Sequence, residues 1–143
     1  MSGKVGHLDC ASVYQQKIVP LQFLKIIVMK RYCQTLDLKD DETLIQEYTY
    51  WHSPEHFWPE IGAGIREVGI LNMEIYRLGS RLFMILETPD DFDWDTAFAR
   101  LATLDRQAEW EAFVAKYQLV VPGATSAEKW QLMDRIFKLP ESK

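Results

Sequence analysis

The first strand and helix are predicted by a change in the pattern of apolar and polar side chains. Residues 30–38 (KRYCQTLDL) alternate as a half-buried strand does. The following KDDET offers Asp40 and Asp41 as helix N-caps, so a helix is expected over residues 43–51. Pro54 disfavours a helical conformation before it and lacks a backbone donor, so we expect the helix to end or kink there.

A second helix and a hairpin follow. In WPEIGAGIREVGI (58–70) the branched apolar residues recur at helical spacing, and a glycine is the expected stop. The runs 70–78 and 81–87 are typical of strands, and Gly79 and Ser80 join them as a tight turn would.

The second half of the chain repeats the alternation of helix and strand. Residues 90–104 and 105–117 carry aromatic and aliphatic side chains on one helical face, and residues 128–140 are expected to form the last strand. The order β-α-β-β-α-β is the ferredoxin-like arrangement of an α+β fold with one antiparallel sheet. Helices would cover one face of that sheet. Because chains of this plan pair through the bare face, we expect a homodimer that closes a dimeric α+β barrel, an analogy of fold alone.

Composition narrows the choice of partners. A net charge of -5 and a pI near 5.2 leave no basic surface for a phosphate backbone, so nucleic acid is not an expected partner. Cys10 and Cys33 form neither a metal-ligand spacing nor a disulfide framework, which favours a reducing, cytoplasmic setting. Aromatic residues make up 13% of the chain, and either core packing or stacking on a sugar accounts for them.

Residues 1–28 differ in character from the rest. Pro20 and polar residues interrupt their apolar run, which is far shorter than the roughly 20 residues that span a bilayer, so no membrane segment is expected. No small-residue cleavage site follows that run. We expect Met29 to be the biological start, with residues 1–28 a mis-assigned start or a disordered arm and residues 29–143 the domain. A partner-binding segment is the alternative.

The segment EYTYWHSPEHFWPEI (47–61) raises the question of a metal. His52, Glu55 and His56 have the H-x-x-E-H spacing of a class of zinc peptidases. Those histidines would have to project from one continuous helical face, which Pro54 is expected to break. The sequence therefore disfavours zinc, and no metal or other cofactor is expected.

Tyr48 and His52 form a second possible site in the same segment. If the helix ends near His52, the two side chains lie one turn apart and face the same way. A histidine with a pKa of about 6.5 exchanges protons near neutrality, so the pair suits acid/base chemistry. A histidine without a role is the alternative that spacing alone leaves open.

Five segments share their residues with one known family. EYTYWHSPEHFWPEI resembles a helix of the pattern E-Y-x-x-x-H-x-P-(x)-W-P-E-[LI], LNMEIY and RLFMILE resemble second and third strands, RQAEWEAF resembles a helix with paired tryptophans, and DRIFKLP resembles a closing strand. The family that they resemble is the L-rhamnose mutarotases, and the resemblance covers residues 29–140. It implies a small dimeric α+β barrel that interconverts the α and β anomers of a 6-deoxy-L-sugar without a cofactor.

The resemblance also implies roles for particular residues. His52 falls on the family's proton-donating histidine and Tyr48 on its sugar-binding tyrosine. Trp110 falls on the second of two adjacent sugar-contacting tryptophans, whereas Glu109 stands in place of the first. Met73 stands where the family's second strand carries a tyrosine. We expect His52 to act as the acid at the ring oxygen of the sugar and Tyr48 to act as an orienting or proton-relay group.

Because of the departures from the family pattern, the sequence does not determine which sugar is the substrate. Asn72 and Glu74 are candidates for hydroxyl contacts or for the opposing base, and a solvated strand face is their alternative. Two additional residues between His52 and Trp58, together with the exchanges at Met73 and Glu109, leave L-rhamnose and L-fucose as rival substrates. Other functions for the fold are a non-catalytic sugar-binding barrel and a cofactor-free monooxygenase-type barrel.

Overall fold

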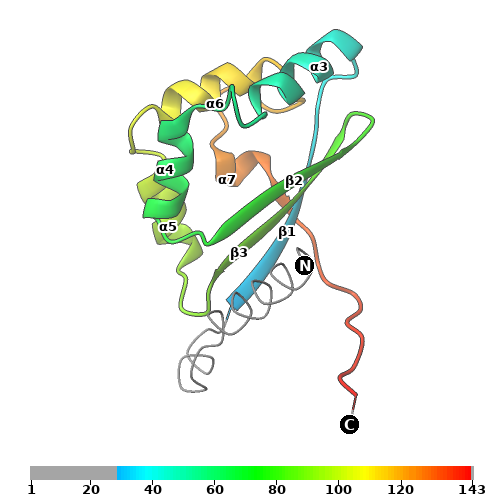
Figure 1. The fold of residues 1–143 in the computed structure, drawn as a ribbon, viewed down its shortest axis with the longest axis vertical. Coiled ribbons are helices and arrows are strands. Elements are labelled where there is room, and N and C mark those ends of the chain that lie inside the picture. The colour runs from blue at the N-terminus through cyan, green and yellow to red at the C-terminus, as the bar shows by residue number, and fades with distance from the viewer. Residues whose placement is uncertain (1–28, 143) are drawn as a thin grey trace, which may run out of the picture.

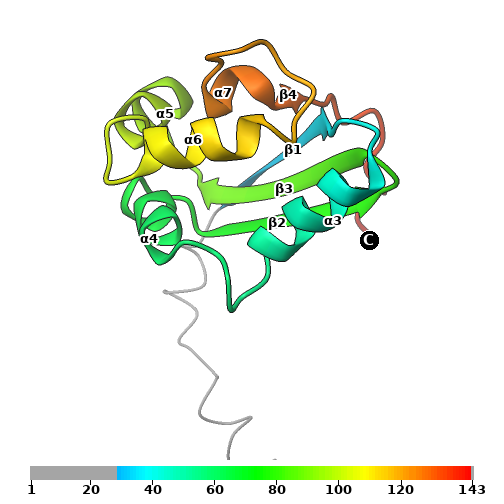
Figure 2. The ribbon, with the colours of Figure 1, turned by 90° about the horizontal axis from the view of Figure 1, so that it is seen from above.

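A computed structural model of the chain describes residues 29–142. They form two layers, a four-stranded antiparallel sheet and a group of helices over one of its faces (Figure 1; Figure 2). The predicted α+β class with the β-α-β-β-α-β order of its main elements is confirmed. The expectations for residues 1–28 lie outside the described residues.

The sheet has the strand order β2-β3-β1-β4. Strands β1 (Met29–Asp37) and β3 (Arg81–Pro89) form the long central pair, and β2 (Asn72–Leu78) lies beside β3. Gly79 turns the β2-β3 hairpin with a φ of 59°, a conformation that suits glycine, so the predicted hairpin is confirmed. Strand β4 (Gln131–Leu132) pairs with the free side of β1.

Two helices connect β1 to β2. Helix α3 (Glu42–Trp51) begins after Asp41, whose carboxylate accepts a hydrogen bond from the backbone N–H of Leu44 at 3.0 Å. The helix ends before Pro54, and α4 (Pro59–Glu67) begins at the next proline. The predicted break is therefore confirmed, and it places the end of α3 above the sheet.

Three helices connect β3 to β4. Helix α5 (Trp94–Leu101) is capped by Asp93, whose carboxylate accepts a hydrogen bond from the backbone N–H of Thr96, and α6 (Gln107–Ala115) and the short α7 (Ser126–Lys129) follow. None of the helices in the described part of the chain is long and apolar enough to cross a membrane.

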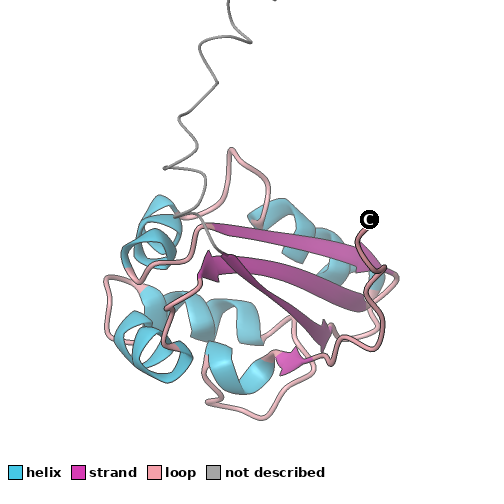
Figure 3. Ribbon diagram, turned by 90° about the horizontal axis from the view of Figure 1, so that it is seen from below, coloured by secondary structure: helices cyan, strands magenta, loops and turns pink. Residues whose placement is uncertain are grey.

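Alternation along β3 separates the two faces of the sheet. Leu82, Met84 and Leu86 are buried against the helices, and they belong to the core together with aromatic and aliphatic residues of α3, α4 and α6. The side chains between them point to the opposite face, which none of the described helices covers (Figure 3). The sheet is thus half of a two-layer structure with one free face.

The predicted last strand, residues 128–140, is wrong over most of its length. Helix α7 and the two-residue β4 take up its start, and residues 133–142, called here the C-terminal arm, have no regular secondary structure. Continuing the register of β4 on β1 would set Arg135 opposite Arg31. Longer pairing would therefore set like charges opposite each other, which destabilises a sheet.

Candidate active site

A cavity lies between the helices and the inner face of the sheet. Its volume is about 380 Å³, near the lower end of the roughly 300–1,000 Å³ typical of ligand pockets. The sheet contributes Met73, Ile75 and Met84 to its lining, and α4 contributes Ile61 and Ile65. Polar side chains from α3 and α6 complete it. An apolar cavity with a few convergent polar groups is typical of a small-molecule site.

His52 forms the C-cap of α3 and lines this cavity. Its Nδ1 atom lies 2.7 Å from the carbonyl oxygen of Tyr48. Because a carbonyl only accepts, the hydrogen resides on Nδ1, and Nε2 of the neutral ring keeps a lone pair. Burial lowers the pKa of His52 below its ordinary value, and the backbone hydrogen bond offsets part of this effect. The ring is therefore a neutral base at pH 7.

Tyr48 lies one turn before His52 on the same side of α3. The two rings stack with their centroids 4.0 Å apart, and only 4% of Tyr48 is exposed. Burial raises the pKa of its phenol far above the ordinary value; the side chain of Gln118 acts against this shift, and the negative charge of Glu111 adds to it. Tyr48 thus stays protonated and presents an O–H donor.

Helix α6 brings Gln107, Trp110 and Glu111 to the cavity. The indole of Trp110 packs edge-on against the imidazole of His52, with centroids 5.3 Å apart. The side-chain Nε2 of Gln107 donates to Glu111 Oε1 at 3.0 Å, and Lys129 Nζ lies 3.1 Å from Glu111 Oε2. Burial raises the pKa of Glu111, whereas the charge of Lys129 lowers it. Of these three residues, only Trp110 was predicted from the sequence as a site residue. The signal for Gln107 and Glu111 was their polar character on an otherwise apolar face of the helix.

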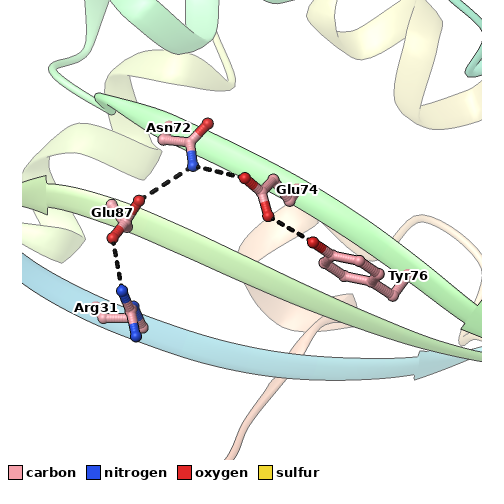
Figure 4. A network of polar contacts seen from close by, with 5 residues as sticks. All are labelled: Arg31, Asn72, Glu74, Tyr76 and Glu87. Atoms are coloured by element: carbon pink, nitrogen blue, oxygen red, sulfur yellow. Dashed lines mark hydrogen bonds and ion pairs between the residues drawn. The ribbon is translucent and has the colours of Figure 1, made fainter.

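The remaining predicted residues of β2 are divided between the faces of the sheet. Met73 and Asn72 line the cavity. The amide of Asn72, however, donates at 3.1 Å to both Glu74 and Glu87 in a network along the strands, which Tyr76 extends by donating to Glu74 (Figure 4). Glu87 alternates with the buried side chains of β3, so this network lies on the free face, and Glu74 does not line the cavity.

Glu109 also does not line the cavity. Its carboxylate accepts two hydrogen bonds from the guanidinium of Arg106, at 2.8 and 3.1 Å. The same guanidinium lies 4.1 Å from the centre of the Trp58 ring, which in turn packs against Trp110 at 5.0 Å. Glu109 therefore belongs to a surface cluster behind the tryptophan and not to the lining.

The two histidines of the H-x-x-E-H spacing are separated. His56 does not line the cavity; it stacks on Tyr50 with centroids 3.8 Å apart, and its Nδ1 lies 2.9 Å from Ser53 Oγ. Within residues 29–142, no group of three or more His, Cys, Asp or Glu side chains is placed to hold a metal ion.

Comparison with known proteins identifies the family. Residues 31–139 match the family described as L-rhamnose mutarotase. The chain belongs to the L-rhamnose mutarotase family. It is 41% identical over 114 residues to an L-fucose mutarotase of Xanthomonas campestris pv. campestris, which covers 80% of this chain and 91% of that protein. It is also 35% identical over 114 residues to a UPF0734 protein of Dictyostelium discoideum, covering 77% and 90% of the two chains.

A solved structure agrees with the fold. An L-rhamnose mutarotase from Formosa agariphila superposes with a TM-score of 0.57 at 18% identity, over 78% of this chain and 99% of that one. The family assignment confirms the prediction of a sugar mutarotase, an isomerase that acts on carbohydrates. It favours that function over a non-catalytic sugar-binding barrel and over a monooxygenase-type barrel.

Proposed function

We propose that this mutarotase acts on a 6-deoxy-L-hexose, with L-fucose as the preferred substrate, and that His52 and Tyr48 transfer the protons. The observation that carries the catalytic part is the neutral imidazole of His52, whose Nδ1 is bound to a backbone carbonyl and whose ring stacks on a protonated phenol inside the cavity. The similarity to an L-fucose mutarotase supports the choice of L-fucose over L-rhamnose.

Mutarotation requires two proton transfers around one carbon atom. In ring opening, Nε2 of His52 takes the proton of the anomeric hydroxyl, the bond between C1 and the ring oxygen breaks, and the Tyr48 phenol gives its proton to the ring oxygen. The aldehyde then rotates about the C1–C2 bond, and both transfers reverse during closure. In this proposal His52 acts as a base in opening and as a proton donor in closure, and not as the acid at the ring oxygen that the sequence suggested, because burial keeps its ring neutral. Each such transfer contributes about 10²- to 10⁴-fold in rate.

Other lining residues are proposed to contact the sugar. Trp110, which is 6% exposed and packs against His52, offers a flat ring to the C–H groups of the substrate. Met73 is the proposed contact from β2; Asn72 borders the cavity, but its amide donates to Glu74 and Glu87 on the free face and is not part of the proposal. Glu74 and Glu109 are not part of this proposal, since neither lines the cavity.

A cytoplasmic homodimer is the proposed working form. The C-terminal arm (133–142) carries Ile136, Phe137 and Leu139, which are 96%, 71% and 75% exposed. It runs away from the edge of the sheet (Figure 1), and the outer face of that sheet is free of described helices (Figure 3). Apolar side chains gathered in this way favour a protein interface. The free thiol of Cys33 suits a reducing compartment.

The proposed activity is tested by saturation-transfer NMR of the anomeric protons of L-fucose and L-rhamnose at equilibrium, with EDTA present. We expect exchange that exceeds the buffer rate, and exceeds it most with L-fucose. His52→Ala should lower the acceleration about 100-fold or more, whereas His56→Ala, a histidine outside the lining, should retain it. Full activity of His52→Ala would refute the role of this residue, and no exchange with either sugar would refute the activity.

A further inference from the structure

Hydrogen-bond acceptors without hydrogen-bond donors occur on residues that line the cavity. Among residues 29–142, four buried side-chain polar atoms lack a hydrogen-bond partner, and all four are oxygens. Three of them belong to residues that line the cavity: Gln107 Oε1, Glu111 Oε2 and Gln118 Oε1. An unsatisfied buried acceptor costs about 1–3 kcal/mol. Three such atoms on residues that line one cavity therefore indicate a ligand that brings donors.

The contacts of these residues leave oxygen atoms as the free ends. Gln107 and Gln118 are only 5% and 3% exposed. Nε2 of Gln107 is occupied by Glu111 Oε1 at 3.0 Å, so the amide oxygen is the end without a partner. Glu111 Oε2 lies 3.1 Å from Lys129 Nζ, and the two groups form an ion pair without the alignment of a hydrogen bond. The Lys129 ammonium donates its hydrogen bond to the backbone carbonyl oxygen of Glu111, at 3.1 Å.

The charge balance of this wall suits a neutral ligand. Lys129, with 1% of its side chain exposed, supplies one positive charge beside the one carboxylate of Glu111. A metal cation would have to compete with that ammonium, whereas neutral hydroxyl groups bring O–H donors without adding charge. A 6-deoxyhexose carries three non-anomeric hydroxyls, on C2, C3 and C4, which equals the number of free acceptors.

We propose that Gln107, Glu111 and Gln118, together called the acceptor wall, bind the non-anomeric hydroxyls of the sugar and determine which sugar the site accepts. The ligand class rests on the proposed function. L-Fucose and L-rhamnose differ in the orientation of the hydroxyls on C2 and C4. A site with fixed acceptors discriminates between such sugars, because a mis-set hydroxyl leaves a buried acceptor unpaired.

The test measures binding separately from catalysis. The probe is 1,5-anhydro-L-fucitol, which keeps the three hydroxyls but lacks the anomeric one and cannot mutarotate. By isothermal titration calorimetry, Gln107→Met and Gln118→Met, which remove an acceptor at similar size, should each weaken binding about 5- to 10-fold. In NMR exchange both should raise KM by a similar factor, and Gln107→Met should leave kcat within about 2-fold. Gln46→Met, an exposed glutamine on α3, is the matched control and should change neither value.

Deoxy analogues of the probe distinguish a direct contact from a general disturbance. Each variant should lose affinity for the parent compound but not for the analogue that lacks the hydroxyl bound at that position. Equal losses for all analogues, unchanged affinities in folded variants, or no binding by the wild-type protein would overturn the inference. Binding that depends on the acceptor wall without anomer exchange would overturn the proposed catalysis alone.

Discussion

Replacing Lys129 by methionine should destabilise the fold by leaving the Glu111 carboxylate without its counter-charge. The Lys129 side chain is 1% exposed and that of Glu111 is 18% exposed, so water screens the pair poorly. Removing one member of a buried ion pair typically costs about 3–5 kcal/mol, because the remaining charge stays buried and unpaired. Lys129→Met also removes the hydrogen bond from Nζ to the Glu111 carbonyl. We expect a loss of about 3–5 kcal/mol in the free energy of unfolding at pH 7.

The sign of the pH dependence identifies the carboxylate as the cause. Burial already raises the pKa of Glu111, and without Lys129 only the hydrogen bond from Gln107 still lowers it. A raised pKa means that the folded state binds the proton more tightly than the unfolded state does. The deficit should therefore be small below the unfolded pKa of about 4.3 and should grow as the pH rises through the folded pKa.

Urea unfolding followed by tryptophan fluorescence at several pH values measures this deficit. The matched control is Arg100→Met, which breaks an exposed pair with Glu67 and should cost no more than about 1 kcal/mol. The double variant Lys129→Met/Glu111→Leu should recover most of the stability, since apolar packing replaces a buried pair well. A deficit below about 1 kcal/mol at pH 7, or one that does not change with pH, would refute the reasoning.

Two further predictions concern catalysis and assembly. The rate of anomer exchange should be constant above pH 7 and should fall in acid with a midpoint below pH 6.5, because the lowered pKa of His52 keeps its ring neutral. NMR exchange measurements from pH 5 to 8 test this prediction. A midpoint above pH 6.5 would contradict it. In analytical ultracentrifugation Phe137→Asp should shift the protein from dimer to monomer. Val121→Asp, an exposed apolar position outside the C-terminal arm, should not, and an unchanged dimer in the first variant would exclude the arm from the interface.

Local signals in the sequence were sufficient for most of the fold. Asp41 caps α3 as predicted, and Pro54 separates α3 from α4 because its effect on the backbone depends on adjacent residues alone. The last strand could not be predicted in the same way. Its apolar residues suggest a strand, but whether a strand forms depends on pairing with a neighbour, and the pairing with β1 ends at Leu132.

The site was predictable where one helical turn defines it. Tyr48 and His52 are four residues apart at the end of α3, and that spacing alone predicts their contact, which the ring stacking at 4.0 Å confirms. Glu74 was a candidate for a hydroxyl contact or the opposing base as a polar residue of the predicted hairpin. Which side chains of β2 point to the cavity, however, depends on the register of β2 with β3. This register places Glu74 on the free face of the sheet.

The acceptor wall lies between these two cases. Gln107 and Glu111 are four residues apart, so the helical period of α6 predicts that they share a face, whereas Gln118 follows the end of α6 and lines the cavity from the segment that bridges to Leu38. Sequence alone does not decide whether that face is solvated or buried. Because that face proves to line the cavity, Gln107 and Glu111 do not form a solvated edge of the helix. A polar residue kept at a buried helix position without a partner in the chain carries a cost, and a bound hydroxyl would remove that cost.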